Sequence, residues 1–323
     1  MMRFFKNANY PFVEIRKYSY AIFIILILAS VIGIIVNGFN WSIDFTGGVA
    51  AKLDLTALDS SIPKVQIDEL RDALKNHGYP EAEIQHVGAV ENSDFMIKIK
   101  RSEEGVDAKG KIIDVIRENF PQHVEGRDIT NEVIAEIYEV GPKVGGELRR
   151  DALIAVGIAL ILMSIYIWFR FELIFGLMAI VALAHDVLIV MGVFALSGKE
   201  MTVQIIAALL TIVGYSINNT IVIFDRIREA LKVRRKEPLD KVINDSINST
   251  LSRTSITSLT TFLATISLYI FGGQVLRDFA LAMSLGVVVG TYSSVMISSN
   301  LVRDFGKMLK SEKAIVQHLA KKK

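Results

Sequence analysis

The chain has 323 residues, 51% of them hydrophobic, and a formal net charge of +2 at pH 7. Several apolar runs reach the roughly 20 residues that a helix needs to cross a bilayer, so the composition predicts a membrane protein and excludes a wholly soluble domain. The chain contains no cysteine, which excludes disulfides, thiol catalysis and cysteine-based metal sites.

The charges are unevenly distributed along the chain. The segment from Trp41 to Arg149 contains 13 basic and 21 acidic residues, a net charge of −8, whereas the remainder has a net charge of +10. In a chain with membrane spans, this separation indicates opposite sides of a bilayer and not a nucleic-acid-binding patch. We therefore expect no nucleic-acid partner.

The first apolar run, from Tyr20 to Val36, follows a basic start. Residues 1–17 are expected to form a cytoplasmic N-terminus and residues 18–38 the first transmembrane helix, which is retained because no A-x-A-like cleavage site follows it. The sequence GFNWSIDFTGG comes next, and its aromatic residues suit the membrane interface while its two final glycines permit a tight turn.

Residues 39–150 are predicted to form a separate domain outside the membrane, because the hydrophobic period changes there. The pattern predicts strands and helices in the order β-α-β-β-α-β, which is the α+β ferredoxin-like arrangement. The expected elements are strand Val49–Leu55, helix Val65–Asn76, strands Glu83–Val90 and Asp94–Lys100, helix Lys109–Asn119 and strand Glu132–Val140.

Enzyme motifs are absent from the sequence. It has no phosphate-binding loop, nucleophile elbow or paired-histidine motif, and His77, His86 and His123 lack the spacing of metal ligands. These patterns argue against an ATPase or a hydrolase. We expect a protein that is not an enzyme and that holds no metal or cofactor.

Residues 151–302 are predicted to return to the membrane five times, which makes six transmembrane helices in a polytopic α-helical protein. The five spans are expected near Ala152–Phe169, Leu173–Leu196, Thr202–Phe224, Ser252–Phe271 and Phe279–Val302.

The basic residues predict the orientation of these helices. Residues 225–253 contain eight Lys and Arg residues and the tail, 303–323, contains seven, while each of the two turns on the opposite side contains one. The positive-inside rule therefore places both termini and a basic loop at 225–251 in the cytoplasm. The acidic domain is then outside.

The fourth span contains two adjacent asparagines, Asn218 and Asn219. Amides are costly at membrane depth unless other groups satisfy them, so these side chains should face other helices or a wet cavity. A role in ion coupling and a role in bonding helices together both remain open. Three charged residues, Asp225, Arg226 and Arg228, mark the cytoplasmic end of this helix.

Polar groups also occur in the third and fifth spans. His185 and Asp186 form an ionisable pair inside the third span, for which a proton or ion role is the leading hypothesis and a hydrogen-bonded structural pair the alternative. Arg253, Thr257 and Thr261 recur every fourth residue in the fifth span and share one face. Such a stripe either joins helices or contributes to a site.

Helical rise predicts the depth of these groups. Asn219 and Arg253 should lie at one level near the cytoplasmic side and could meet, whereas the His–Asp pair lies nearer the outer half and could be a second station. The sixth span contains Gly286 and Gly290, which predict close helix packing. It also contains Ser293, Ser294, Ser298 and Ser299.

Five motifs together resemble the SecF family of protein-export membrane subunits, within the SecD/SecF group of the resistance-nodulation-division superfamily. They are DFTGG (Asp44, Phe45, Thr46, Gly47 and Gly48), GPKVGGELRRDA, AHDV, GYSINNTIVIFDRIRE and LSRTSITSLTT. The resemblance covers most of the chain. It implies six helices in the bacterial inner membrane, one ferredoxin-like periplasmic domain between the first two, and a pseudo-symmetric pairing with SecD.

The resemblance also implies a role and further partners. Members of this family use an ion gradient to help unfolded preproteins emerge from the SecYEG channel, and YajC and YidC are further expected partners. Cyclic movement of the outer domain, passed on through residues 39–48 and 141–150, would hinder backsliding of the emerging chain.

One position departs from the family pattern. Many relatives have an aspartate where this chain has Asn219, and an amide does not titrate. Either a carboxylate of SecD titrates while Asn219 and Arg253 shape its site, or the coupling ion is Na⁺, which amide and hydroxyl oxygens can bind. A buried arginine without a counter-charge is costly, which favours a carboxylate from the partner.

Two other functions are compatible with parts of the sequence. A half-transporter of the same superfamily that exports a small molecule or lipid would share the helices, although larger outer domains would be expected. An intramembrane aspartyl protease would need a second carboxylate opposite Asp186, and the sequence has no GxGD-type motif to supply it.

Overall fold

The computed structural model describes residues 8–59, 61–87, 93–100, 108–171 and 173–309. The chain divides into two compact units. The first, here the membrane unit, comprises Met1–Asn40, Ile154–Lys199 and Gln204–Lys323. The second, here the extramembrane unit, comprises Trp41–Leu153 and Glu200–Val203. Residues 200–203, which lie between the third and fourth predicted spans, belong to the second unit.

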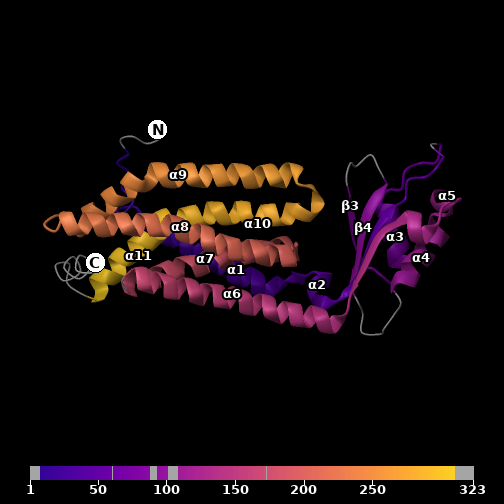
Figure 1. Ribbon diagram of the computed structural model, residues 1–323, viewed down its shortest axis with the longest axis horizontal. Helices are drawn as coiled ribbons and strands as arrows, with labels where there is room; N and C mark the ends of the chain where they lie inside the picture. The colour runs from indigo at the N-terminus through magenta and orange to yellow at the C-terminus, as the bar shows by residue number, and fades with distance from the viewer. Residues whose placement is uncertain (1–7, 60, 88–92, 101–107, 172, 310–323) are drawn as a thin grey trace. The chain divides into compact units, whose positions relative to one another are not determined.

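Six helices within the described residues are long and apolar enough to cross a membrane, which confirms the six predicted spans. The last span is not a single regular helix, because a π-helix, η2, separates α10 from α11. Figure 1 labels the α-helices of these spans. The segments are α1 (Arg16–Asn37), α6 (Pro142–Arg170), α7 (Leu173–Ser197), α8 (Val203–Val233), α9 (Leu239–Phe271), α10 (Gly273–Tyr292), η2 (Ser293–Ser298) and α11 (Ser299–Leu309).

Small residues allow these helices to approach closely. A Cβ atom on Gly192 of α7 would lie 2.3 Å from the Cβ of Ser30 on α1, and a Cβ on Gly286 of α10 would lie 2.3 Å from the side chain of Ile212 on α8. Lipid provides little hydrophobic drive for association, so close van der Waals contact matters. The predicted packing role of Gly286 is confirmed.

The segment expected to be a loop at 225–251 is a helical hairpin. Helix α8 continues to Val233 and α9 begins at Leu239, so only a short turn separates them. The polar sequence after residue 225 is rich in Arg, Lys and Glu, which favour helix, and Pro238 is the N-cap of α9. The charged residues of this segment therefore indicate that it is exposed to water. They do not indicate that the helix ends there.

The extramembrane unit contains a four-stranded antiparallel sheet in the order β3-β4-β2-β5. Its element order follows the predicted one. The strands are β2 (Gly48–Asp54), β3 (Glu83–His86), β4 (Asp94–Lys100) and β5 (Ile134–Val140), and the helices are α3 (Ile67–Asn76), α4 (Ala108–Asn119), α5 (Pro121–Val124) and the π-helix η1 (Ile129–Val133). The predicted strand at 83–90 extends past β3, and its positions 88–90 lie outside the described residues.

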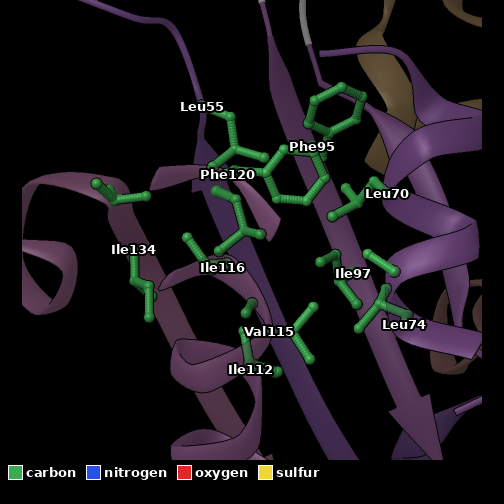
Figure 2. Close-up of a cluster of buried hydrophobic side chains, with 14 of the residues drawn as sticks. Leu55, Leu70, Leu74, Phe95, Ile97, Ile112, Val115, Ile116, Phe120 and Ile134 are labelled. Atoms are coloured by element: carbon green, nitrogen blue, oxygen red, sulfur yellow. The ribbon is translucent and has the colours of Figure 1, made fainter. Parts of the chain in front are cut away.

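Alternation along β4 explains where the core of this unit lies. Phe95, Ile97 and Ile99 are buried on one face of the sheet, while Lys98 and Lys100 point to the other. The buried face meets apolar side chains of α3 and α4, such as those drawn in Figure 2.

Three short elements belong wholly or partly to this unit. They are β1 (Asn40–Trp41), α2 (Ile43–Thr46) and β6 (Glu200–Met201), the last lying between α7 and α8 in the chain. Strands β1 and β6 pair, and the amide of Ser42 donates to the carbonyl of Met201 at 3.0 Å. Two-residue strands have no detectable period, so the sequence did not predict them.

Candidate intramembrane site

Asp186 is fully buried in α7 and accepts three hydrogen bonds. Its Oδ2 accepts from the hydroxyl of Ser216 on α8 at 2.5 Å and from that of Ser293 at the start of η2 at 2.8 Å. Its Oδ1 lies 3.0 Å from Nδ1 of His185. One carboxylate therefore joins three segments of the membrane unit.

His185 is held between this carboxylate and α1. Its imidazole stacks on Phe23, with ring centroids 4.2 Å apart and ring planes 12° from parallel. Its Nε2 is buried and has no hydrogen-bond partner in the described part of the chain. A buried ring nitrogen of this kind either carries an unsatisfied proton or offers a free lone pair.

Asn219 belongs to a second hydrogen-bonded group, which centres on Ser258 of α9. The Oγ of Ser258 accepts from Asn219 Nδ2 at 3.4 Å, from the Tyr215 hydroxyl at 2.9 Å and from the Thr291 hydroxyl at 2.7 Å. This group therefore links α8, α9 and α10.

The two groups lie next to each other on α8, because Ser216 of the first group and Asn219 of the second share one face of that helix. Ser294 of η2 donates to the carbonyl of Ser216 at 3.3 Å, and its hydroxyl lies 2.9 Å from that of Thr220. Gly290 keeps the layer compact, because a Cβ there would lie 3.0 Å from the Cβ of Ser216 and 3.5 Å from Asp186 Oδ2. We use the name polar layer for the residues of both groups together with these contacts: His185, Asp186, Tyr215, Ser216, Asn219, Thr220, Ser258, Thr291, Ser293 and Ser294.

The structure does not bring Arg253 to Asn219. Arg253 is exposed on α9, and the residue of α9 that contacts Asn219 is Ser258. Five positions separate these two residues, or about 7.5 Å of helix. The threonines that follow Arg253 belong to its own helix surface, where the hydroxyl of Thr261 donates to the carbonyl of Thr257 at 3.0 Å.

Asn218 also lies outside the polar layer, because its side chain is exposed on α8. The helical period explains the difference: Ser216, Asn219 and Thr220 share a face, and Asn218 does not. The sequence could not tell which of the two adjacent asparagines would be buried.

The charged residues at the end of the fourth span connect α8 to the neighbouring helices. Asp225 accepts from Arg170 at 3.0 Å and pairs with Arg228 at 3.6 Å. Arg226 donates to Ser249 of α9 at 3.1 Å. These contacts join α8 to the end of α6 and to α9, which is a structural role at the helix ends.

The DFTGG segment packs against the start of α6 within the extramembrane unit. Asp44 accepts from the hydroxyl of Ser42 at 3.0 Å, and Phe45 is buried beside Gly145. Gly47 has a φ of +80°, and a Cβ there would lie 2.8 Å from the Cα of Pro142. Thr46 donates its hydroxyl to the carbonyl of Ser42 at 3.1 Å, and Gly48 begins β2. These residues build a close backbone contact.

Sequence reasoning missed the hydroxyl residues that complete the polar layer. Serine and threonine are common in membrane helices as helix-joining residues, so their type alone does not mark a site. The signal that was available is spacing: Ser216 lies three residues before Asn219 on the same face of α8. The residues missed are Tyr215, Ser216, Thr220, Ser258 and Thr291.

A buried ionisable pair also lies in the extramembrane unit. Lys98 of β4 forms an ion pair with Glu200 of β6, and Glu200 is 6% exposed. Burial raises the pKa of Glu200 to about 7, and the neighbouring carboxyl group of Glu83 adds to the rise against the lowering effect of Lys98. Glu83 is the cross-strand partner of Lys98, so β3, β4 and β6 all contribute to this pair.

Comparison with known proteins shows an extensive similarity. The family described as "Protein export membrane protein SecD/SecF, C-terminal" matches residues 122–308, and the family described as "SecD/SecF GG Motif" matches residues 32–49. The chain is 40% identical over 307 residues to the protein translocase subunit SecF of Rhodothermus marinus, which covers 93% of this chain and 94% of that one. It is 39% identical over 296 residues to the SecF subunit of Desulfurispirillum indicum, covering 90% of each.

A solved structure is similar as well. The crystal structure of SecDF from Thermus thermophilus, described as a translocon-associated membrane protein, superposes with a TM-score of 0.79 at 39% sequence identity. The match covers 95% of this chain and 40% of that chain.

Proposed function

This chain belongs to the SecD/SecF family of protein export membrane proteins, and we propose that it acts as the SecF-type subunit of a protein translocase in which a cation gradient drives late steps of preprotein translocation. The role is one of transport, without catalysis and without a cofactor. The competing role, export of a small molecule or lipid by a half-transporter, would need a substrate path that no described residue suggests.

The observation that carries the proposal is the polar layer inside the membrane unit. A carboxylate and an imidazole are costly in a membrane interior, and such groups are retained where they respond to ions or to the membrane potential. Here Asp186 and its hydroxyl partners belong to three different segments. A change of charge at this carboxylate therefore acts on the packing of several helices together.

SecD is the expected partner. The similar SecDF protein of Thermus thermophilus is longer, and this chain matches 40% of it, which supports an association with a SecD half. Arg253 is exposed on α9 and forms no ion pair with the residues that the structure describes. A carboxylate of SecD that pairs with Arg253 would satisfy this charge, and Na⁺ as the coupling ion remains the alternative.

The extramembrane unit is proposed to be a ferredoxin-like periplasmic domain. The strand order β3-β4-β2-β5, with α3 and α4 packed on the buried face, supports this assignment. With both termini in the cytoplasm of a bacterial inner-membrane protein, this unit would meet unfolded preproteins as they leave SecYEG. YajC and YidC are proposed as accessory partners.

The free energy for preprotein translocation would come from the movement of a cation's charge across the membrane potential. One charge that crosses a potential of 100 mV gains about 2.3 kcal/mol, which is enough to bias two helix arrangements that differ by a few kcal/mol. The segments before β2 and after β5 would pass the shift to the extramembrane unit.

The test is preprotein export into inverted membrane vesicles, with a proton gradient or a sodium gradient imposed separately. We expect one gradient to stimulate export in vesicles that contain the complex and not in vesicles without it. Arg253→Met should reduce the stimulation, because it removes the charge proposed to face SecD. Full stimulation with this variant would place the counter-charge elsewhere.

Asn219 and Asn218 provide a matched pair for the same assay. Asn219→Ala removes a hydrogen bond in the polar layer, whereas Asn218→Ala changes an exposed side chain on the same helix. We expect the first to reduce the gradient-dependent part of export and the second to leave it unchanged. If neither gradient affects export by the native complex, the proposed function is wrong.

A further inference from the structure

We propose that β6 is a pH-sensitive latch on the sheet of the extramembrane unit, which stays docked while Glu200 is protonated and is released when Glu200 loses this proton. In the docked state β6 lies against β4 through Glu200 and Lys98. The latch is outside the membrane-spanning helices, and its release requires neither SecD nor an ion gradient.

The latch lies in a short connection between two membrane helices. Helix α7 ends at Ser197 and α8 begins at Val203, while residues 200–203 belong to the extramembrane unit by their contacts. Lys199, the residue before β6, forms an ion pair at 2.9 Å with Asp278 of α10, within the membrane unit. Release of β6 therefore removes the contact through which the connection between α7 and α8 reaches the sheet.

Few contacts hold β6 in the docked state. It pairs with β1, and the amide of Ser42 donates to the carbonyl of Met201 at 3.0 Å. The side chain of Met201 is completely buried. A two-stranded ribbon is at best marginally stable in water, so the protonation state of one buried side chain can decide whether a strand of two residues stays bound.

The hydrogen-bond partners of Glu200 suit its protonated form. The ammonium of Lys98 donates to Oε2, whereas Oε1 is buried and has no hydrogen-bond partner among the described residues. An ionised carboxylate accepts at both oxygens, and an unpaired buried oxygen is costly. The carboxyl group of Glu83 lies within hydrogen-bonding reach, so a protonated Glu200 can donate to it. Two carboxyl groups this close ionise together only at a cost.

The lysines nearby do not remove this preference. Lys98 is shared, because Glu83 of β3 is its cross-strand neighbour. Lys100, on the same face of β4, lies 4.0 Å from Glu83. Burial lowers the pKa of Lys98, but the carboxylate of Glu200 raises it above its ordinary value. This lysine therefore stays charged near neutral pH, and the proton of the cluster is gained or lost at a carboxyl group.

The other elements around β6 bring no second cation into contact with Glu200 in the part of the chain that the structure describes. From β5, Tyr138 stays neutral because burial raises its pKa, and Asp44 of α2 lies near this tyrosine as a further negative charge. Arg149 of α6 lies over the ring of Trp41 in β1, 4.4 Å from the ring centroid.

The direction of the pH effect follows from burial. Burial raises the pKa of docked Glu200 to about 7, against the lowering effect of Lys98 and with a further rise from Glu83. Released into water, Glu200 should return to its ordinary value of 4.5. Docking is therefore favoured at low pH and is lost as the pH rises through 7. Between about pH 5 and 8, the ratio of docked to released β6 should fall about seventyfold.

Hydrogen–deuterium exchange of the full chain in lipid nanodiscs measures this release without any substitution. Protection factors, which correct for the intrinsic pH dependence of exchange, are compared at about pH 5 and 8. We expect the protection of peptides from residues 40–44 and 199–203 to fall by up to about seventyfold. Their protection should also be lower than that of β4 peptides at pH 8. In Glu200→Gln the fall should be absent, and in Glu136→Gln, an exposed change on β5, it should persist.

A single thiol provides a second measurement. The chain contains no cysteine, so Met201→Cys introduces one thiol that is covered while β6 is docked. Its rate of labelling, divided by that of the exposed thiol in Glu136→Cys, should rise with pH by a factor similar to the loss of protection. Addition of Glu200→Gln to the Met201→Cys chain should abolish this rise.

Several results would overturn the latch. Equal protection of the β6 and β4 peptides at both pH values would show that β6 opens only when the whole unit unfolds. Protection of residues 199–203 that is constant or increases from pH 5 to 8, or the wild-type fall in Glu200→Gln, would exclude Glu200 as the switch. These measurements need no export, so their failure leaves the proposed function standing.

Discussion

The buried Glu200 predicts an unusual pH dependence for the stability of the extramembrane unit. Its pKa is about 7 in the folded protein, against an ordinary value of 4.5, because burial disfavours the charged carboxylate. Between these two values the folded state holds a proton that the unfolded state has lost. The contribution of Glu200 to stability is therefore highest below about pH 4.5 and falls as the pH rises toward 7.

The magnitude follows from the size of the shift. A rise of about 2.5 pKa units at 1.36 kcal/mol per unit corresponds to about 3 kcal/mol of unfolding free energy lost across this window. The variant Glu200→Gln keeps a polar group beside Lys98 but cannot titrate. Its unfolding free energy should therefore lack the loss of about 3 kcal/mol that Glu200 causes in the wild type over the same range.

Pulse proteolysis of the protein in vesicles, over a urea series at several pH values, measures this difference. Glu136→Gln is the matched control, because it removes an exposed carboxylate from β5 of the same sheet and should keep the wild-type slope. A wild-type unfolding free energy that rises from pH 4.5 to 7, or a Glu200→Gln variant with the wild-type slope, would refute the reasoning.

Three further predictions concern packing. Phe95→Ala should destabilise the extramembrane unit by about 3–5 kcal/mol in pulse proteolysis, because Phe95 is completely buried. Gly47→Ala should cost about 1–3 kcal/mol in the same assay, since φ is +80° and Pro142 blocks a Cβ, whereas Gly146→Ala meets nothing and should be neutral. Gly192→Leu should lower the thermal unfolding temperature in detergent by forcing α1 from α7, and Gly157→Leu, in open space on α6, should not.

The sequence predicted the elements of this protein better than their partners. Long apolar runs located the six spans, and alternating residues such as Phe95 and Ile97 located β4, because both signals are local. The hairpin at 225–251 was misjudged as a loop, since charge reports contact with water and not backbone conformation. The pairing of β1 with β6 joins residues about 160 positions apart, and no local pattern encodes it.

The candidate site shows the same limit. The sequence identified Asp186, His185 and Asn219 by the cost of polar groups in a membrane. It also paired Asn219 with Arg253 by depth, whereas the structure pairs Asn219 with Ser258. Depth fixes a position along a helix but not its rotation, and rotation decides which side chains meet.

The glycine contact between the DFTGG segment and the start of α6 has a consequence for engineering. The backbone where the chain reaches β2 and the backbone where it leaves β5 touch at Gly47 and Pro142, with no side chain between them. The whole sheet with its helices is therefore a cassette whose two ends are adjacent. It should be removable at this junction, or replaceable by another module with neighbouring termini, through a linker of only a few residues.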